Sequence, residues 1–240
     1  MSLQSELTRL QENVESIVSS KDAIFVALAD KGVTIPQGAT LHDVPGLIGM
    51  IDGRAPVPVP TVVIGGRTYV TVTIGNQEWM TENLDYQFDG LTISNGVSSS
   101  AAYGTYGGQS GFGLFYNGVA ARLLEANKTT LLPDGWRVPT QGDLNGLLSA
   151  GGTNASELRT ADGWPSGYEG TNGTGFSAYP CGRFANNTIY QYGMVAQFWS
   201  CTLSGDSGYQ MDLHLEPGFF AVGSQSYSAF LKIRLVKDLE

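Results

Sequence analysis

A proline-alternating segment divides this sequence into two parts with different hydrophobic periods. The segment reads DGRAPVPVPT over residues 52–61, with proline at every second position from 56 to 60. Alternating prolines favour an extended, semi-rigid polyproline II spacer and do not continue a helix. We therefore expect an amino-terminal segment over residues 1–53, a linker over 54–61 and a larger domain over 62–240.

The first thirty residues carry a heptad pattern. Apolar side chains recur every seven residues, and a second set follows each four residues later: Leu3, Leu10, Ile17 and Ile24, then Leu7, Val14, Lys21 and Leu28. Such a seam over about four heptads predicts an oligomeric coiled coil, with Lys21 as the one polar position. The alternative is a single amphipathic helix packed on its own domain. We favour the coiled coil because little precedes this helix for it to pack on.

After residue 61 the pattern indicates strands. Residues 61–80, TVVIGGRTYVTVTIGNQEWM, predict β-strands that turn at Gly65–Gly66 and Gly75–Asn76. Residues 88–113 are rich in Gly, Ser and Tyr and have no clear period. Thr140 is placed to cap a short helix that begins at Gln141. Many short strands with two or three short helices predict an α+β domain.

Charge and hydropathy exclude two classes of partner. The formal net charge is −9, and the few Lys and Arg residues form no basic stripe, so we expect no nucleic-acid groove. No stretch approaches the roughly 20 apolar residues that span a bilayer, so we expect no membrane insertion. The start of the chain lacks a secretory n-region and h-region, so either it is not exported by that route or the export signal is not part of this sequence.

Metal and catalytic motifs are missing from the sequence. Two cysteines, Cys181 and Cys201, and two histidines, His42 and His214, have no zinc-ligand spacing; the cysteines are either separate buried thiols or a disulfide. No GxSxG elbow accompanies the histidines, and nothing in the spacing of the carboxylates selects an acid–base pair. We therefore expect no metal, no cofactor and no enzymatic activity.

Several phrases, in order along the chain, carry a family resemblance. They are VTIGNQEWMTENLDY, GLFYNGVAA, LLPDGWRVPT, GTNGTGFSAYPCGRF, FWSCT and FLKIRLVKD. Together, over about residues 62–238, they resemble the Fibrobacter succinogenes major paralogous domain family. Leu235 and Cys181 depart from residues that are common in that family. By the same resemblance, GWRVPT is a fold signature in which Trp136 packs in the core, Arg137 satisfies nearby carbonyls and Thr140 starts a helix.

The resemblance implies a fold and a function. The family is similar to C-type-lectin-like folds, in their formylglycine-generating-enzyme branch, and to the variable proteins of diversity-generating retroelements. In those variable proteins the C-terminal segment binds the ligand, and a phage tropism determinant of this kind is a trimer. The cysteines here do not match the reactive pair of formylglycine-generating enzymes, and the Ca²⁺-dependent sugar signatures of C-type lectins are missing. Residues 31–51 resemble a segment of phage tail-fibre proteins.

We expect the ligand-contacting surface in the C-terminal third, where aromatic side chains mix with Gly, Ser and Gln as in antibody paratopes. Alternation in YQMDLHL places Met211 and Leu213 on one face and Gln210, Asp212 and His214 on the other, the expected surface. Phe219 and Phe220 stay undecided between core and surface, and Phe230 is an expected anchor. The expected contact residues are Tyr190, Tyr192, Tyr209, Asp212, His214, Glu216, Phe219, Phe220, Ser224, Gln225, Ser226 and Tyr227.

The sequence as a whole thus predicts a C-type-lectin-like ligand-binding domain on a trimeric coiled-coil stalk. Its expected function is adhesion to a host-surface protein or glycan, as a receptor-binding protein of a phage tail, located in the virion. The alternative is a bacterial cell-surface adhesin or lipoprotein, and a formylglycine-generating-like enzyme comes third.

Overall fold

The computed structural model describes residues 21, 23–29, 34, 59–105, 112–152, 155–204, 207–215 and 220–239. The chain divides into two compact units, residues 1–59 and 60–240. In the first unit residues 23–29 are helical, and the Lys21 ammonium lies 5.4 Å from the centroid of the Phe25 ring. Most of the predicted heptad seam and of the linker lies outside the described residues, so the coiled coil and the trimer stay predictions.

The second unit is an α+β domain that begins with a β-meander. The strands β1 (Thr61–Ile64), β2 (Arg67–Ile74) and β3 (Gln77–Met80) pair antiparallel. The predicted turns at Gly65–Gly66 and after Ile74 are confirmed, and Gly65, Gly66 and Gly75 all have positive φ. This left-handed geometry matches the twist of the flanking strands in a two-residue hairpin. The β14 (Val236–Asp238) and β7 (Trp136–Arg137) strands complete a five-stranded sheet of order β1-β2-β3-β14-β7.

A six-stranded sheet collects short strands from distant parts of the chain. Its order is β4 (Thr92–Ile93), β5 (Ala102–Gly104), β6 (Phe115–Asn117), β13 (Phe230–Leu231), β8 (Arg183–Ala185) and β9 (Thr188–Tyr190). Only β4 and β5 are parallel to each other. The irregular region of residues 88–113 therefore contributes two short strands to the sheet.

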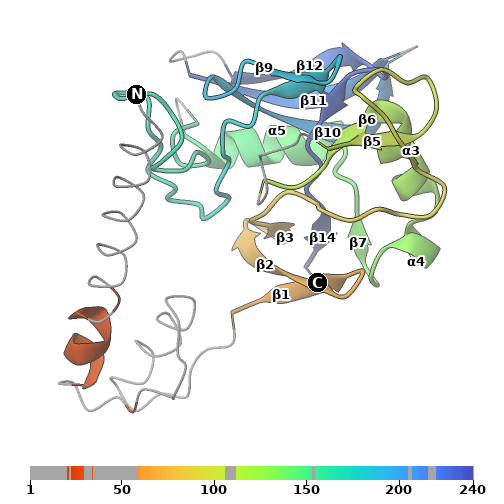
Figure 1. The fold of residues 1–240 in the computed structure, drawn as a ribbon. Coiled ribbons are helices and arrows are strands. Elements are labelled where there is room, and N and C mark those ends of the chain that lie inside the picture. Colours follow the sequence, from red (N-terminus) through yellow and green to blue (C-terminus); the bar gives the residue numbers. More distant parts are fainter. Residues whose placement is uncertain are drawn as a thin grey trace, which may run out of the picture. The chain divides into compact units, whose positions relative to one another are not determined.

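A three-stranded antiparallel sheet forms the third layer. It consists of β10 (Val195–Ser204), β11 (Ser207–His214) and β12 (Phe220–Ser226), in that order. Figure 1 shows it at the top of the domain, with β1, β2 and β3 at the bottom. Single bridges from β10 to Gly182 and Lys232 connect this sheet to the segments that carry β8 and β13.

Among the described residues of the domain there are three short helices, α3 (Gly118–Ala126), α4 (Lys128–Leu131) and α5 (Gln141–Ala150). The predicted cap of α5 is confirmed, because the Thr140 hydroxyl accepts from the Asp143 amide in a capping box. Leucines of α5 pack with Trp79, Phe176, Phe198 and Met211 in one apolar cluster. In Figure 1, α5 accordingly lies under the three-stranded sheet.

Residues 230–236 form two strand ends rather than the single strand that FLKIRLV predicts. β13 ends at Leu231, Lys232 makes one bridge, and β14 begins at Val236. All seven residues are buried, including Lys232 and Arg234. The segment crosses the middle of the domain, where it joins two sheets and cannot keep one straight register. Phe230 is fully buried, as expected for an anchor.

Candidate ligand-binding groove

A surface groove of about 400 Å³ lies where the end of β12 meets the β8–β9 hairpin. Its floor contains the buried rings of Phe184 and Phe230, and the exposed Tyr190 ring stands on one wall. This volume is typical of ligand sites in folded proteins. The lining residues are Gly96, Val97, Arg183, Phe184, Ala185, Asn186, Tyr190, Gln225, Ser226, Ser228, Ala229 and Phe230.

Local backbone chemistry shapes one wall of this groove. Asn186 and Asn187 connect β8 to β9 with φ values of 48° and 58°. Asparagine tolerates this left-handed region, so the pair forms a tight hairpin turn. Gly96, with a φ of 92°, lies so close to this hairpin that a Cβ atom would stand 2.6 Å from the Ala185 Cα. The hairpin and the turn at residues 94–97 are therefore held together at one side of the groove.

The groove combines one charged side chain with several neutral polar groups. The Arg183 guanidinium lies 5.8 Å from the centroid of the Tyr190 ring, and Arg183 is the one charged side chain among the lining residues. Two further lining residues, Ser226 and Ser228, have hydroxyls that are 3.0 Å apart. The Gln225 Oε1 accepts from the Ser226 amide at 3.1 Å. One cation, small hydroxyls and an aromatic ring are groups that can orient a polar ligand.

Beside the groove, the face of the three-stranded sheet that is turned away from α5 holds a polar row. Gln197 and Asp212 are cross-strand partners, and Gln210 lies two residues before Asp212 on the same face. The Gln210 Nε2 donates to the Asp212 Oδ2 at 3.4 Å. Burial raises the pKa of Asp212, although the charge of His214 and the two amides favour its carboxylate. Arg183 also lies near enough to favour that charged form, which links the row to the groove wall.

The expectation that Gln210 is a surface residue is wrong. Gln210 is only 5% exposed, and within the described residues its Oε1 has no hydrogen-bond donor. Gln210 lies on the central strand of its sheet, and its cross-strand partner Trp199 is itself fully buried in the largest apolar cluster. Asp212 and His214 are half-buried, so the alternation of YQMDLHL separates the two faces correctly but does not predict exposure.

Tyr227 is also placed differently from the expectation. Its hydroxyl is buried and has no partner within the described residues, and its ring packs against Gly118, Gly208 and the Arg122 guanidinium. A ring held against α3 and β11 in this way supports the fold rather than standing free for a ligand. Gly118 and Gly208 lack a Cβ at the positions that the Tyr227 ring occupies.

The remaining expected contact residues are not gathered at one place. Tyr190, Gln225 and Ser226 line the groove. Tyr192 instead joins Phe112 and Tyr179 in a separate aromatic cluster, in which the two tyrosine hydroxyls are 3.4 Å apart. Phe220 packs against the second apolar cluster, and Tyr209 and Ser224 face each other on β11 and β12. Glu216 and Phe219 lie outside the described residues.

Sequence reasoning missed several groove residues, above all Arg183, Val97 and Ser228. Nothing in the local pattern of CGRFANNT singles out Arg183, because its place on the groove wall depends on the pairing of β8 with β13. The signal that was present is the Asn186–Asn187 pair, a typical hairpin turn.

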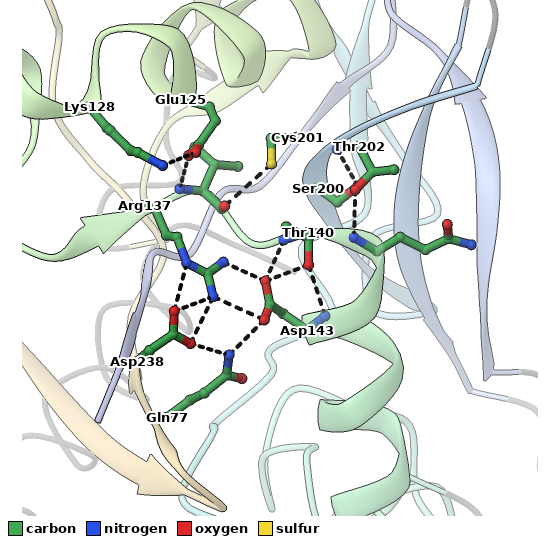
Figure 2. Close-up of polar contacts among 12 residues, drawn as sticks. Gln77, Glu125, Lys128, Arg137, Thr140, Asp143, Ser200, Cys201, Thr202 and Asp238 are labelled. Carbon is green, nitrogen blue, oxygen red and sulfur yellow. Dashed lines mark hydrogen bonds and ion pairs between the residues drawn. The ribbon is translucent and has the colours of Figure 1, made fainter. Parts of the chain in front are cut away.

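The GWRVPT motif forms a closed ion-pair network rather than a site with free groups. Figure 2 shows Arg137 between the carboxylates of Asp143 and Asp238, with Gln77 donating to both. Hydrogen bonds to Asp143 raise the pKa of Arg137. Burial raises the pKa of Asp143, but Arg137 and Thr140 outweigh it and leave that pKa well below its usual range. Arg137 therefore pairs with carboxylates and not with the carbonyls that the sequence led us to expect, whereas Trp136 is buried as expected.

The two cysteines are free thiols. Cys181 is buried and Cys201 half-buried, so of the two alternatives the disulfide is wrong. Burial raises the pKa of both thiols, that of Cys201 to about 11. Both sulfurs therefore stay protonated near neutral pH, which disfavours them as nucleophiles.

Two other kinds of site are missing from the described part of the chain. Among its residues no group of three or more His, Cys, Asp or Glu side chains is arranged to hold a metal ion. None of its helices combines the length and the apolar character needed to cross a bilayer.

Fold and groove together define a β-rich α+β domain with a ligand-sized surface groove. The chain belongs to the Fibrobacter succinogenes major domain family, whose match covers residues 72–237. No curated protein and no solved structure matches the chain.

Proposed function

We propose that this protein is a non-enzymatic receptor-binding protein whose C-terminal domain holds a host-surface ligand in the groove. The observation that carries the proposal is the meeting of Tyr190, Gln225 and Ser226 with the charged Arg183 around one cavity of about 400 Å³. An exposed aromatic ring supplies contact area, and serine and amide groups supply adaptable hydrogen bonds. Arg183 supplies the one fixed charge.

We also propose a fold for the domain and an oligomeric state for the chain. We infer a C-type-lectin-like fold for residues 62–240, from the resemblance of the sequence to that branch and to retroelement variable proteins. The heptad pattern of residues 3–28 supports a trimeric stalk. Three grooves on one stalk would raise a weak affinity for a cell surface through avidity.

The proposed location is the tail of a phage or prophage particle, where such a trimer meets a bacterial host. The support is the tail-fibre-like segment at residues 31–51 together with the heptad pattern before it. Immunogold labelling of induced particles tests this location. Labelling of the bacterial surface alone would favour the cellular adhesin.

Binding of the fluorescently labelled chain to a panel of bacterial strains tests the groove. The variant Arg183→Gln/Tyr190→Ala/Ser226→Ala removes three groove side chains that are exposed to solvent. We expect at least a tenfold loss of apparent affinity for the bound strains, with little change in melting temperature. The control is Lys128→Gln on α4, outside the groove. Unchanged binding by the triple variant would remove the groove as the contact site.

A further inference from the structure

The strand β12 is the last strand of the three-stranded sheet. It pairs with β11 on one side, and on its other side no described strand follows it. With seven residues it is longer than the end strands of the other two sheets, β1, β7, β4 and β9, which have two to four residues. An edge strand of this length offers a row of backbone groups to which another strand can bond.

Hydrogen bonds around the central strand β11 show which of its backbone groups face β12. The Tyr209 carbonyl oxygen accepts from the hydroxyl of Ser200 on β10 at 2.8 Å. Directly after β11, the Leu215 amide donates to the Met194 carbonyl oxygen at 2.8 Å, on the same side. Because successive residues of a strand point their backbone groups to opposite sides, the odd-numbered residues of β11 face β10 and the even-numbered ones face β12.

The outward groups of β12 follow from this alternation. The residues that stand opposite even-numbered residues of β11 bond to that strand, and they are Ala221, Gly223 and Gln225. The N–H and C=O groups of Phe220, Val222 and Ser224 therefore point away from the sheet. Ser226 agrees with this assignment, because its amide donates to the Gln225 side chain.

The opposite edge of the same sheet is already bonded. On β10 the carbonyl oxygens of Val195 and Gln197 accept from the amides of Gly182 and Lys232. The Trp199 amide donates to the Lys232 carbonyl oxygen at 2.9 Å. Successive outward groups of β10 are thus paired within the domain, whereas no described backbone group pairs with the outward groups of β12 at residues 220–224.

The sequence of β12 also lacks the features that usually keep an edge strand from pairing. It reads FAVGSQS, with no charged residue and no proline. Its register with β11 is continuous over all seven positions, so no bulge interrupts it. Ala221, Ser224 and Ser226 are exposed to solvent. The edge is therefore regular, uncharged and accessible.

Size and position select the occupant of this edge. Two copies of β12 paired edge to edge would bury far less than the roughly 1,200 Å² of a stable interface. An extended segment of another protein gains more, because β12 ends at the groove, which Gln225 and Ser226 line. A segment that pairs along β12 can continue into that groove and make side-chain contacts there.

We propose that the edge of β12 binds an extended, uncharged segment of a host-surface protein by strand addition, with one end of that segment in the groove. The inference rests on the proposed receptor-binding function and names the class of its ligand, which is a protein and not a glycan. Backbone hydrogen bonds to residues 220–224 supply affinity, and the groove supplies side-chain selectivity.

Binding of the full-chain variant Ser224→Pro to the bound bacterial strains tests the edge. Proline is tolerated on an edge strand where the nitrogen points outward, but it removes a donor and places its ring in the path of an added strand. We expect at least a tenfold loss of apparent affinity. The matched control is Val63→Pro on the end strand β1, where the bond from the Thr71 amide to the Pro60 carbonyl makes Val63 an outward position too. It should bind as the unmodified chain does.

Two outcomes separate this inference from the proposed function. Unchanged binding by Ser224→Pro, together with lost binding by Arg183→Gln/Tyr190→Ala/Ser226→Ala, would overturn strand addition and leave the receptor-binding function standing. Digestion of the cells with proteinase K should abolish binding, and periodate oxidation of their glycans should not. Binding that survives the protease and is lost after periodate would identify a glycan ligand and overturn the inference.

A second measurement needs neither a host cell nor a folded Ser224→Pro variant. Short random peptides from a display library are selected on the full unmodified chain, and hydrogen exchange is then measured residue by residue. We expect the selected peptides to slow exchange of the Val222 and Ser224 amides, which face solvent in the free chain. Peptides that leave both amides unchanged, or a selection that yields none, would overturn strand addition. Protection of both amides while no strain is bound would support the edge and contradict only the receptor-binding function.

Discussion

Gly96 lets the turn at residues 94–97 lie against the β8 strand more closely than a side chain would permit. A Cβ atom at this position would stand 2.6 Å from the Ala185 Cα, and the backbone φ of 92° is unfavourable for other residues. Gly66 has a similar φ of 82° but no neighbouring atom within 4 Å. Both glycines therefore have a backbone conformation that strains other residues, but only Gly96 also lies in close contact with a neighbouring strand.

Exchange of Gly96 for Ala is expected to lower the free energy of unfolding by about 2 kcal/mol more than exchange of Gly66 for Ala. Gly66→Ala carries only the left-handed backbone penalty, roughly 1–2 kcal/mol. Urea denaturation of both variants and of the unmodified chain measures the difference. Equal losses would mean that the contact between the turn and β8 is looser than the structure indicates.

The buried ammonium of Lys232 predicts a stability gain at alkaline pH. Its pKa is about 8 in the folded protein, below the ordinary 10.5. Below pH 8 the group is protonated in both states and its buried charge lowers stability. Between pH 8 and 10.5 the unfolded chain binds the additional proton, so the free energy of unfolding rises with pH.

Urea unfolding at pH 7.5 and 9.5 in sodium gluconate, for the unmodified chain and for Lys232→Met, tests this effect. From pH 7.5 to 9.5 the unmodified chain should gain about 2 kcal/mol relative to the variant. Cys181 and Asp85 interact with the Lys232 charge and are present in both proteins, and making the comparison in a Cys181→Ser background removes the titration of the thiol. A constant difference between the two proteins would show that the ammonium does not titrate in this range.

At the scale of elements, the start of α5 is joined to the five-stranded sheet by one network. Asp143 completes the capping box with Thr140 and also receives Arg137 of β7, which in turn binds Asp238 of β14 (Figure 2). The side chains of Arg137 and Asp143 are 16% and 11% exposed. The network therefore fixes a helix end against two strands at one point.

Acid should weaken this connection. The folded pKa of Asp143 lies below the ordinary value, because hydrogen bonds from Arg137 and Thr140 outweigh the opposite effect of burial. Its stabilisation is thus present above about pH 4 and is lost as the pH falls toward the folded pKa. In urea unfolding between pH 6 and pH 2.5, Asp143→Asn should lose less stability than the unmodified chain, by on the order of 1–2 kcal/mol. The surface control Asp89→Asn should follow the unmodified chain; identical acid profiles for all three would refute the role of Asp143.

At the scale of the whole molecule, the heptad pattern predicts that three chains assemble through residues 1–53. Multi-angle light scattering of the full chain should give a mass of about 77 kDa, three times 25.6 kDa. Replacing the seam residues Leu7 and Val14 by Lys should reduce the mass to that of one chain and weaken cell binding through lost avidity. A single-chain mass for the unmodified protein would contradict the trimer.

The sequence by itself determined the features that depend on neighbouring residues. Gly65–Gly66 and Gly75–Asn76 predicted the turns of the β-meander, and Thr140 predicted the start of α5. Period-two alternation separated the two faces of β11. The family resemblance, placed at about residues 62–238, is confirmed by the family match over residues 72–237. Each of these signals is carried by residues within one turn, one helix end or one strand, or by motifs in fixed order.

Only the tertiary structure decided burial and the composition of the groove. Gln210 is buried because β11 is central in its sheet and Trp199 lies opposite, and Tyr227 is held by α3. Arg183 reaches the groove wall through pairing of β8 with a strand that lies near the end of the chain. The buried Lys232 meets Gly113, which is 119 residues earlier in the sequence. These contacts join segments that are far apart along the chain, so no local pattern contains them.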